Sequence, residues 1–279
     1  MRITTLTENS TTRMGLLAEH GLSMLVEGDG WRILFDTGQT TTAVHNARAM
    51  RLDLGSVDTI ALSHGHADHT GGLQEILSEV AWEGRDVEVI GHPDIWASRF
   101  AIRRNQDPYQ IGIPFPREEL EGLGARFRLE KGPVEIAEGV MLTGEVPRVT
   151  PFEHLDADLK VPDGDGWRQD ELLDDQSLIV RTGEGLVVIL GCAHSGMINT
   201  LRHAQQLMGE ERILAVVGGT HLGPASPEQF EETVMALQEL GVQKLGVSHC
   251  TGLAAAARLF ATFGPAFFFN VAGTVVEFP

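Results

Sequence analysis

Cysteine, positive charge and long apolar runs are all scarce in this chain of 279 residues. Two cysteines, Cys192 and Cys250, are too few for a disulfide framework, which suits a reducing compartment. Lys and Arg total 21 against 39 Asp and Glu, and the net charge of −18 disfavours nucleic acid and anionic membranes as partners. No apolar run approaches the roughly 20 residues of a membrane helix, and the N-terminus lacks the apolar core of a signal peptide. We therefore expect a cytoplasmic protein that acts on a small molecule, in an oligomeric state that the sequence leaves open.

The remaining composition is that of an ordinary globular protein. Hydrophobic residues make up 42% of the chain and charged residues 22%. The length suits one large α/β domain or two small ones. Strand patterns are followed by helix patterns in two halves, near 1–145 and 177–279, and we expect these halves to form one sandwich rather than two domains.

Between these halves, residues 147–175 are dense in Pro, Gly and Asp and show little periodicity. They are predicted to form an irregular loop, a type of segment that often serves as a lid or binding loop. Upstream, a helix is predicted from Pro93 to Arg103, a loop over 104–118, and two or three short antiparallel strands over 125–142. A pair of strands is expected to close the chain.

The most informative stretch runs from Ser63 to Gly72, because it holds three histidines and one aspartate within six residues, directly after an apolar run. Imidazole nitrogen and carboxylate oxygen are ligands that Zn²⁺ and similar ions prefer. In an extended segment His64 and His66 project to the same side, so both can bind one ion. Asp68 and His69 follow after a turn and can reach a second ion. A polar loop that happens to be rich in histidine is the alternative, but the spacing and the position after a strand favour metal binding.

Histidines also follow other predicted strands. In layered α/β folds, the ends of strands and the loops after them form the ligand site. Histidines with a purely structural role would not be expected to gather there. The histidines in question are His64, His92, His194, His221 and His249.

The cluster His64-x-His66-x-Asp68-His69 before Gly71-Gly72 resembles the signature of the metallo-β-lactamase superfamily. The segment Leu-Phe-Asp-Thr-Gly at 34–38 resembles another sequence motif of that family. The resemblance covers essentially the whole chain and implies a single α/β (α+β) domain, a four-layer αββα sandwich. It also implies one or two divalent metals at the edge between the sheets, most plausibly Zn²⁺, with Mn²⁺ and Fe²⁺ also compatible with such ligands.

A narrower resemblance involves the segments 19–23, 191–196, 219–222 and 249–252. They are similar to a subgroup whose members are labelled metal-dependent hydrolases or dihydropterin-methyl ribofuranosylaminobenzene phosphate synthases. The second label denotes a condensation in methanopterin-type cofactor assembly. Because one fold hosts many chemistries, these motifs leave the reaction open.

The chain departs from the superfamily pattern where a later strand ends in Gly191-Cys192-Ala193-His194, since the usual bridging aspartate is missing. Cys192 either takes that bridging place as a thiolate ligand or is a small core residue. The resemblance implies one metal on His64, His66 and His194, and a second on Asp68, His69 and His249.

Further roles are expected for residues near these ligands. Asp68 is a candidate to orient the attacking water, and His221 either donates a proton to the leaving group or lines the pocket. Asp36 either fixes the tautomer of a ligand histidine or closes its strand as an Asx turn. Candidate substrate-binding residues, each with an ordinary structural alternative, are His20, His92 and Arg148.

The leading functional prediction is a hydrolase that uses metal-activated water on a small ester, lactone or phosphoester. The first alternative is a metal-dependent transferase that condenses a dihydropterin-methyl diphosphate with a ribofuranosylaminobenzene phosphate. The second is a non-catalytic metal-binding protein. Turnover of generic esters that a chelator abolishes would favour the hydrolase over both alternatives.

Overall fold

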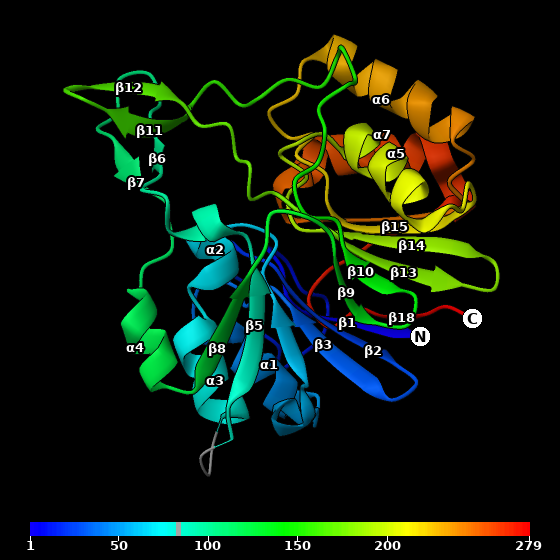
Figure 1. Cartoon of the computed structure of the whole chain (residues 1–279). Coiled ribbons are helices and arrows are strands. Elements are labelled where there is room, and N and C mark those ends of the chain that lie inside the picture. Colours follow the sequence, from blue (N-terminus) through cyan, green and yellow to red (C-terminus); the bar gives the residue numbers. More distant parts are fainter. Residues whose placement is uncertain (82–84) are drawn as a thin grey trace.

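Several strands of this protein contain continuous apolar runs, such as those at 33–35 and 186–190, because their sheets are buried on both faces. The computed structural model describes residues 1–81 and 85–279. Two large sheets lie face to face, with helices on both outer sides (Figure 1). Ile3, Met24 and Phe35 of one sheet pack against Val187 and Val217 of the other. This arrangement is the predicted αββα sandwich.

The first sheet has the order β18-β1-β2-β3-β4-β5-β8. Gly28 pairs with Trp31 across the tight turn between β2 and β3, so the predicted hairpin is confirmed. Its strands are β1 (Arg2–Thr7), β2 (Ser23–Gly28), β3 (Trp31–Phe35), β4 (Thr59–Ala61), β5 (Val87–Gly91), β8 (Ala125–Leu129) and β18 (Val275–Glu277). Its outer face carries α1 (Thr42–Ala49), α3 (Leu73–Val80) and α4 (Arg117–Gly122), with the short α2 (Ala67–Thr70) at one end.

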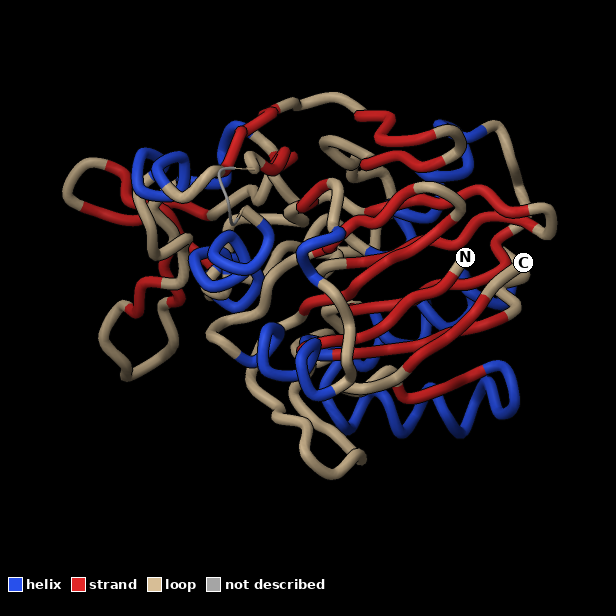
Figure 2. Tube along the Cα trace, turned by 90° about the horizontal axis from the view of Figure 1, so that it is seen from below, coloured by secondary structure: helices blue, strands red, loops and turns tan. Residues whose placement is uncertain are grey.

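The second sheet has the order β17-β16-β15-β14-β13-β10-β9. Its central strands β14, β15 and β16 are parallel, so their carboxyl ends meet at one edge. The long strands run side by side across the molecule (Figure 2). Its strands are β9 (Val134–Ala137), β10 (Val140–Leu142), β13 (Leu178–Thr182), β14 (Gly185–Leu190), β15 (Ile213–Gly219), β16 (Lys244–Ser248) and β17 (Phe267–Phe269). The helices on its outer face are α5 (Met197–Met208), α6 (Pro227–Glu239) and α7 (Gly252–Phe263).

A third, small sheet projects beside α2 (Figure 1). It consists of β6 (Phe100–Ala101), β7 (Tyr109–Gln110), β11 (Leu159–Asp163) and β12 (Gly166–Gln169). The expectation that 147–175 is irregular is therefore wrong for its second half. The Asp163-Gly164-Asp165-Gly166 turn, in which Gly164 has a φ of +56°, is a hairpin signal that the sequence contains. The predicted loop over 104–118 likewise includes β7 and the start of α4.

The helix predicted from Pro93 to Arg103 is also wrong. A single 3₁₀ turn covers Pro93–Trp96, and Ala97 then turns the chain to an extended conformation. Arg99 is buried and pairs with Asp170 at 2.9 Å and Asp174 at 2.6 Å. This tertiary pairing outweighs the local helix preference of the segment.

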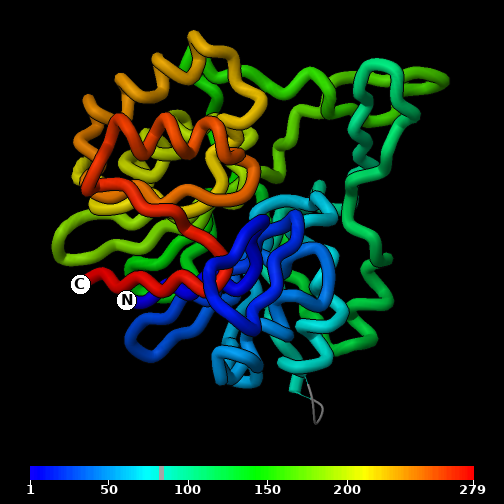
Figure 3. The backbone as a smooth tube through the Cα atoms, turned by 180° about the vertical axis from the view of Figure 1, so that it is seen from behind, coloured from blue at the N-terminus to red at the C-terminus, as the bar shows by residue number. Residues whose placement is uncertain are grey.

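The predicted strands over 125–142 are divided between the two large sheets. β8 pairs in parallel with β5, whereas β9 and β10 are antiparallel strands of the second sheet. The chain therefore passes to the second sheet near residue 130, earlier than the expected boundary at 145. The last two strands do not pair with each other, because β17 joins β16 and β18 joins β1 (Figure 3). Among the described residues, no helix is both long enough and apolar enough to cross a membrane.

Candidate metal centre

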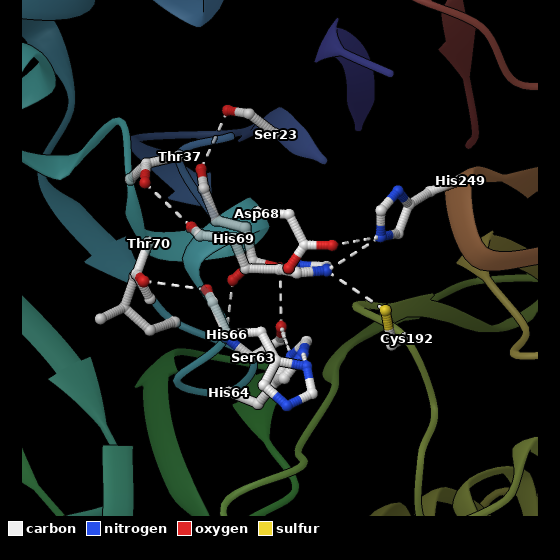
Figure 4. A network of polar contacts seen from close by, with 12 residues as sticks. Ser23, Thr37, Ser63, His64, His66, Asp68, His69, Thr70, Cys192 and His249 are labelled. Carbon is white, nitrogen blue, oxygen red and sulfur yellow. Dashed lines mark hydrogen bonds and ion pairs between the residues drawn. The ribbon is translucent and has the colours of Figure 1, made fainter. Parts of the chain in front are cut away.

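The histidine-rich motif follows β4, as its sequence predicts, and it enters the short helix α2, which the sequence analysis did not predict. His66 has extended φ and ψ values of −72° and 146° at the start of α2. His64 Nε2 lies 3.0 Å from His66 Nδ1, so the two rings face the same space. Figure 4 shows these rings beside Asp68 and His69.

Two glycines let this motif pack against the turn after β3. A Cβ at Gly71 would lie 2.3 Å from the carbonyl oxygen of Gln39, and one at Gly72 would lie 2.2 Å from that of Thr37. Both distances are far below ordinary contact, so only glycine allows this approach. The backbone N–H of Thr37 donates to the carbonyl of His69 at 2.8 Å, which fixes the turn against α2.

Three parallel strands bring distant side chains to the same edge. Cys192 and His194 follow β14, His221 follows β15 and His249 follows β16. The ring centroid of His194 lies 4.9 Å from those of both His64 and His66. The His249 centroid lies 5.0 Å from that of His69. The predicted residues thus converge, while their roles as ligands stay predictions.

The separations between these side chains suit ligands of a shared ion. His69 Nε2 lies 3.3 Å from His249 Nε2 and 3.2 Å from Cys192 Sγ. Asp68 Oδ2 lies 3.2 Å from His249 Nε2. Two nitrogens bound at 2.0–2.1 Å to a tetrahedral ion are about 3.4 Å apart. The atoms therefore already stand near coordination distances.

Cys192 lies close to two separate pairs of histidines. Its sulfur lies within 4.8 Å of ring nitrogens of His64 and His194 in one group, and of His69 and His249 in the other. Figure 4 shows Cys192 facing His69 from the second sheet. Its position between the groups is where a bridging ligand would lie.

The unpartnered nitrogens of the histidines also fit a metal. Burial lowers the pKa of His64 and His194 well below the usual value, and that of His66 to about 3. These rings are therefore neutral, which is the form that binds metal. Among the described residues, His66 Nε2 and both ring nitrogens of His194 have no hydrogen-bond partner. A divalent ion would satisfy buried atoms that are otherwise costly to leave unpaired.

Asp68 is held as a carboxylate by its neighbours. Burial alone raises the pKa of its carboxyl group, but the charge of His69 and hydrogen bonds from His20 and His249 hold the pKa well below its usual range. His20 Nε2 lies 3.2 Å from Asp68 Oδ2, although the His20 side chain is largely exposed. His20 is thus at the pocket, as expected for a candidate substrate-binding residue.

Asp36 lies behind His69 in the buried interior. Its carboxylate accepts hydrogen bonds from the backbone N–H and the hydroxyl of Ser63, both at 2.7 Å, and lies 2.6 Å from His69 Nδ1. Burial lowers the pKa of His69, but the charges of Asp36 and Asp68 raise it to about 9. The contact expected between Asp36 and a ligand histidine is therefore present, and it directs His69 Nε2 toward Cys192.

Strained backbone is concentrated at this centre. Four non-glycine residues next to the cluster have left-handed backbone conformations, a class that costs on the order of 1–3 kcal/mol per residue. Such strain persists where the surrounding structure enforces it, and it is common at functional sites. The residues are Asp36 (φ 58°), Ala193 (56°), His221 (50°) and His249 (53°).

A pocket of about 750 Å³ opens over the cluster. Five histidines (His20, His66, His194, His221 and His249) line it together with Asp68 and both cysteines. Arg103, Tyr109 and Asp156 also belong to its lining. Asp156 Oδ2 lies 3.4 Å from His221 Nε2. Asp156, Asp158 and Leu159 of segment 147–175 thus form part of the pocket wall, a position that suits the binding loop expected there.

That wall is attached to the start of α5. Glu153 accepts hydrogen bonds from the backbone N–H groups of Ile198 at 2.7 Å and Asn199 at 2.8 Å. Asn199 Oδ1 in turn accepts from the N–H groups of Val149 and Thr150. These bonds hold the segment against the second sheet's helices.

Two predicted substrate-binding residues lie elsewhere. His92 is buried, with Nδ1 accepting from the backbone N–H of Asp94 and Nε2 lying 3.1 Å from Glu145. Arg148 donates to the hydroxyl of Ser195 at 3.3 Å and so holds the loop. Both expectations are corrected, because these side chains stabilise turns outside the pocket. Cys250, a pocket residue that sequence reasoning missed, directly follows His249 and could have been noticed there.

Comparisons with known proteins agree with this geometry. A family model described as the metallo-beta-lactamase superfamily matches residues 17–198. The chain belongs to this superfamily. A 7,8-dihydropterin-6-methyl-4-(beta-D-ribofuranosyl)-aminobenzene-5'-phosphate synthase of Methanocaldococcus jannaschii is 31% identical over 272 residues, 94% of this chain and 90% of that protein.

Solved structures show the same fold. A crystal structure of a metal-dependent hydrolase of the beta-lactamase superfamily matches with a TM-score of 0.83 and 32% identity, over 100% of this chain and 99% of that one. Zn²⁺-bound PqqB from Methylobacterium extorquens matches with a TM-score of 0.55 at 12% identity, over 100% of both chains, and shares the fold alone. Ribonuclease Z of Clostridium perfringens is 31% identical over only 120 residues, 42% of this chain and 36% of that enzyme.

Proposed function

We propose that this chain is a metal-dependent hydrolase that acts on a small ester, lactone or phosphoester. The observation that carries the proposal is the convergence of ligand atoms at separations of 3.0–3.3 Å. We assign His64, His66 and His194, whose ring centroids lie 4.5–4.9 Å apart, to one divalent ion. We assign Asp68, His69 and His249 to a second, with the sulfur of Cys192 within 4.8 Å of ring nitrogens of both sets. Zn²⁺ suits the mixed nitrogen, oxygen and sulfur donors best.

A divalent ion bound here would lower the pKa of a bound water and polarise the substrate oxygen. The protein's own side chains hold and orient the attacking water, the ligand histidines and the substrate. Asp68, kept ionised and open to the pocket, accepts a hydrogen bond from the attacking water and so directs it. Asp36 fixes the orientation of the His69 ring through Nδ1. His221 lies on the pocket wall beside Asp156, from which it either donates a proton to the leaving group or contacts the substrate.

The pocket supports a small substrate. Its volume falls within the range of about 300–1,000 Å³ that is typical of small-molecule sites. The net charge of −18 disfavours nucleic acid, and the resemblance to ribonuclease Z covers less than half of either chain.

The test is turnover by protein loaded with Zn²⁺, Mn²⁺ or Fe²⁺. We expect hydrolysis of bis(p-nitrophenyl) phosphate, p-nitrophenyl acetate or a simple lactone, loss of activity with a chelator, and recovery on adding metal. Bound metal without turnover of any of these compounds would contradict the hydrolase.

A second candidate is a synthase that joins a dihydropterin-methyl diphosphate to a ribofuranosylaminobenzene phosphate. The full-length similarity to the M. jannaschii synthase, at 31% identity, favours it. In that reaction the residues around the metals would hold a diphosphate leaving group rather than a nucleophilic water. Diphosphate release that depends on both organic substrates would support the synthase, whereas release with water alone would support hydrolysis.

A further inference from the structure

We propose that Cys192, Cys250 and His221 form an additional metal position in this pocket, selective for a thiophilic ion such as Zn²⁺ or Cd²⁺. It extends the proposed metal centre and shares Cys192 with it. The sulfur atoms of both cysteines and a ring nitrogen of His221 all lie within 4.8 Å of one another. These are the chain's two cysteines, 58 residues apart in sequence.

The fold delivers these ligands from three neighbouring strands. Cys192 follows β14, His221 follows β15 and Cys250 follows β16, and these strands are parallel neighbours. Their carboxyl ends therefore place the three side chains in a row at one edge. Two thiolates and one imidazole, with a fourth position open, form a ligand set that binds catalytic zinc in other proteins.

The local backbone is arranged around the sulfur of Cys250. A Cβ at Gly219 would lie 2.7 Å from that sulfur, so only glycine at this position leaves room for the Cys250 sulfur. His221 has a left-handed φ of 50°, and its backbone N–H donates to Cys250 Sγ at 3.2 Å. Backbone donation to sulfur stabilises a thiolate, which is the form that binds metal.

The ring of His221 is free to bind an ion and is already oriented. Among the described residues, neither of its ring nitrogens makes a hydrogen bond. Asp156 lies 3.4 Å from Nε2, where a carboxylate can hold a ligand histidine in place. All three ligands line the pocket, so an ion can enter from solvent. With an ion bound, His221 acts as a ligand and not as a proton donor.

The test is a Cd²⁺ titration of metal-free protein under a phosphine reductant, monitored by thiolate-to-metal charge-transfer absorption. The variants are Cys250→Ser and His221→Asn, because asparagine tolerates the left-handed backbone. His66→Ala is the matched control, since His66 is assigned to the ion held with His64 and His194 and does not belong to the group that Cys192, His221 and Cys250 form. Thermal unfolding establishes that each variant is folded.

We expect wild type and His66→Ala to show the band. In Cys250→Ser the charge-transfer band should have about half of the wild-type intensity. Cys250→Ser and His221→Asn should both bind Cd²⁺ at least tenfold more weakly than the wild type. Unchanged affinity and intensity in Cys250→Ser, or loss of the band in His66→Ala, would overturn the proposal. Should a variant fail to fold, alkylation of the wild type decides: Cd²⁺ is expected to protect both thiols, and an unprotected Cys250 would refute the site. Turnover enters neither measurement, so failure here is distinct from failure of the hydrolase proposal.

Discussion

At the scale of single residues, the centre combines a local motif with partners that only the fold supplies. The spacing of His64 and His66 predicts that their rings share one side, and their 3.0 Å nitrogen separation agrees. A contact between Asp36 and one of the motif histidines is one of the two roles predicted for Asp36, and the structure places His69 there. The position of Cys192 between two histidine groups depends on sheet packing, and the sequence left it open.

Replacing His66 with Ala tests the motif. The variant should lose the ion assigned to His64, His66 and His194, and most turnover, because a ligand nitrogen disappears, while the fold and the other metal positions remain. Elemental analysis and circular dichroism measure the two outcomes. His45→Ala, an exposed histidine on α1, is the control and should keep its metal. Full activity in His66→Ala would refute the site.

Replacing Asp36 with Asn tests how the ligand ring is held. The substitution keeps the shape of the side chain and removes its charge. Because the remaining carbonyl oxygen is needed by the backbone N–H of Ser63, the amide NH2 group faces His69 Nδ1 in place of an acceptor. Loss of such a partner typically lowers metal affinity 10- to 100-fold. Competition with a chromophoric chelator measures the change. An affinity equal to that of the wild type would show that Asp36 serves only to close its strand.

At the scale of elements, two contacts connect the pocket wall to the centre. The residue before helix α5, Gly196, has no side chain to cap the helix, and Glu153 supplies the missing acceptor. Asp174 accepts from the backbone N–H of Gly65 at 2.7 Å, between the proposed ligands His64 and His66, while pairing with Arg99. Segment 147–175 is therefore a structural part of the site.

The Glu153 contact predicts a pH-dependent stability. Burial raises the pKa of Glu153 to about 7, above 4.5 in the unfolded chain, although its backbone hydrogen bonds act in the opposite direction. The folded protein therefore binds a proton that the unfolded chain releases, and this stability is lost as the pH rises from about 4.5 through 7. Glutamine does not titrate. As the pH rises from 5 to 8, the free energy of unfolding of Glu153→Gln should increase relative to that of the wild type by up to about 3 kcal/mol.

Urea unfolding at both pH values measures this difference. Glu232→Gln, an exposed position on α6, is the matched control and should show no relative change. If the unfolding free energies of Glu153→Gln and wild type differ by the same amount at pH 5 and pH 8, the raised pKa of Glu153 is contradicted.

The Asp174 contact predicts a large loss of stability on truncation. Asp174→Ala leaves Arg99 buried with one partner fewer and Gly65 N–H without its acceptor. Breaking a buried pair in this way costs about 3–5 kcal/mol. Glu121→Ala removes the exposed partner of Arg117 and should cost less than about 1 kcal/mol. Similar shifts in melting temperature for both variants would contradict the account.

At the scale of the whole molecule, the layered fold could be predicted, but several connections could not. Apolar runs and the Gly28–Gly30 turn predict strands, and the family resemblance predicts how they stack. The small sheet depends on Arg99 meeting Asp170 and Asp174, a tertiary pairing that leaves no local pattern. The left-handed backbone at Ala193 is equally invisible in sequence, because alanine does not favour it.

The most direct test of the metal centre is an anomalous-difference map of crystals grown with Zn²⁺, recorded at the zinc absorption edge. The account predicts density enclosed by His64, His66 and His194, and further density enclosed by Asp68, His69 and His249. Zinc bound only away from these side chains, or no anomalous density in the pocket at saturating Zn²⁺, would contradict it.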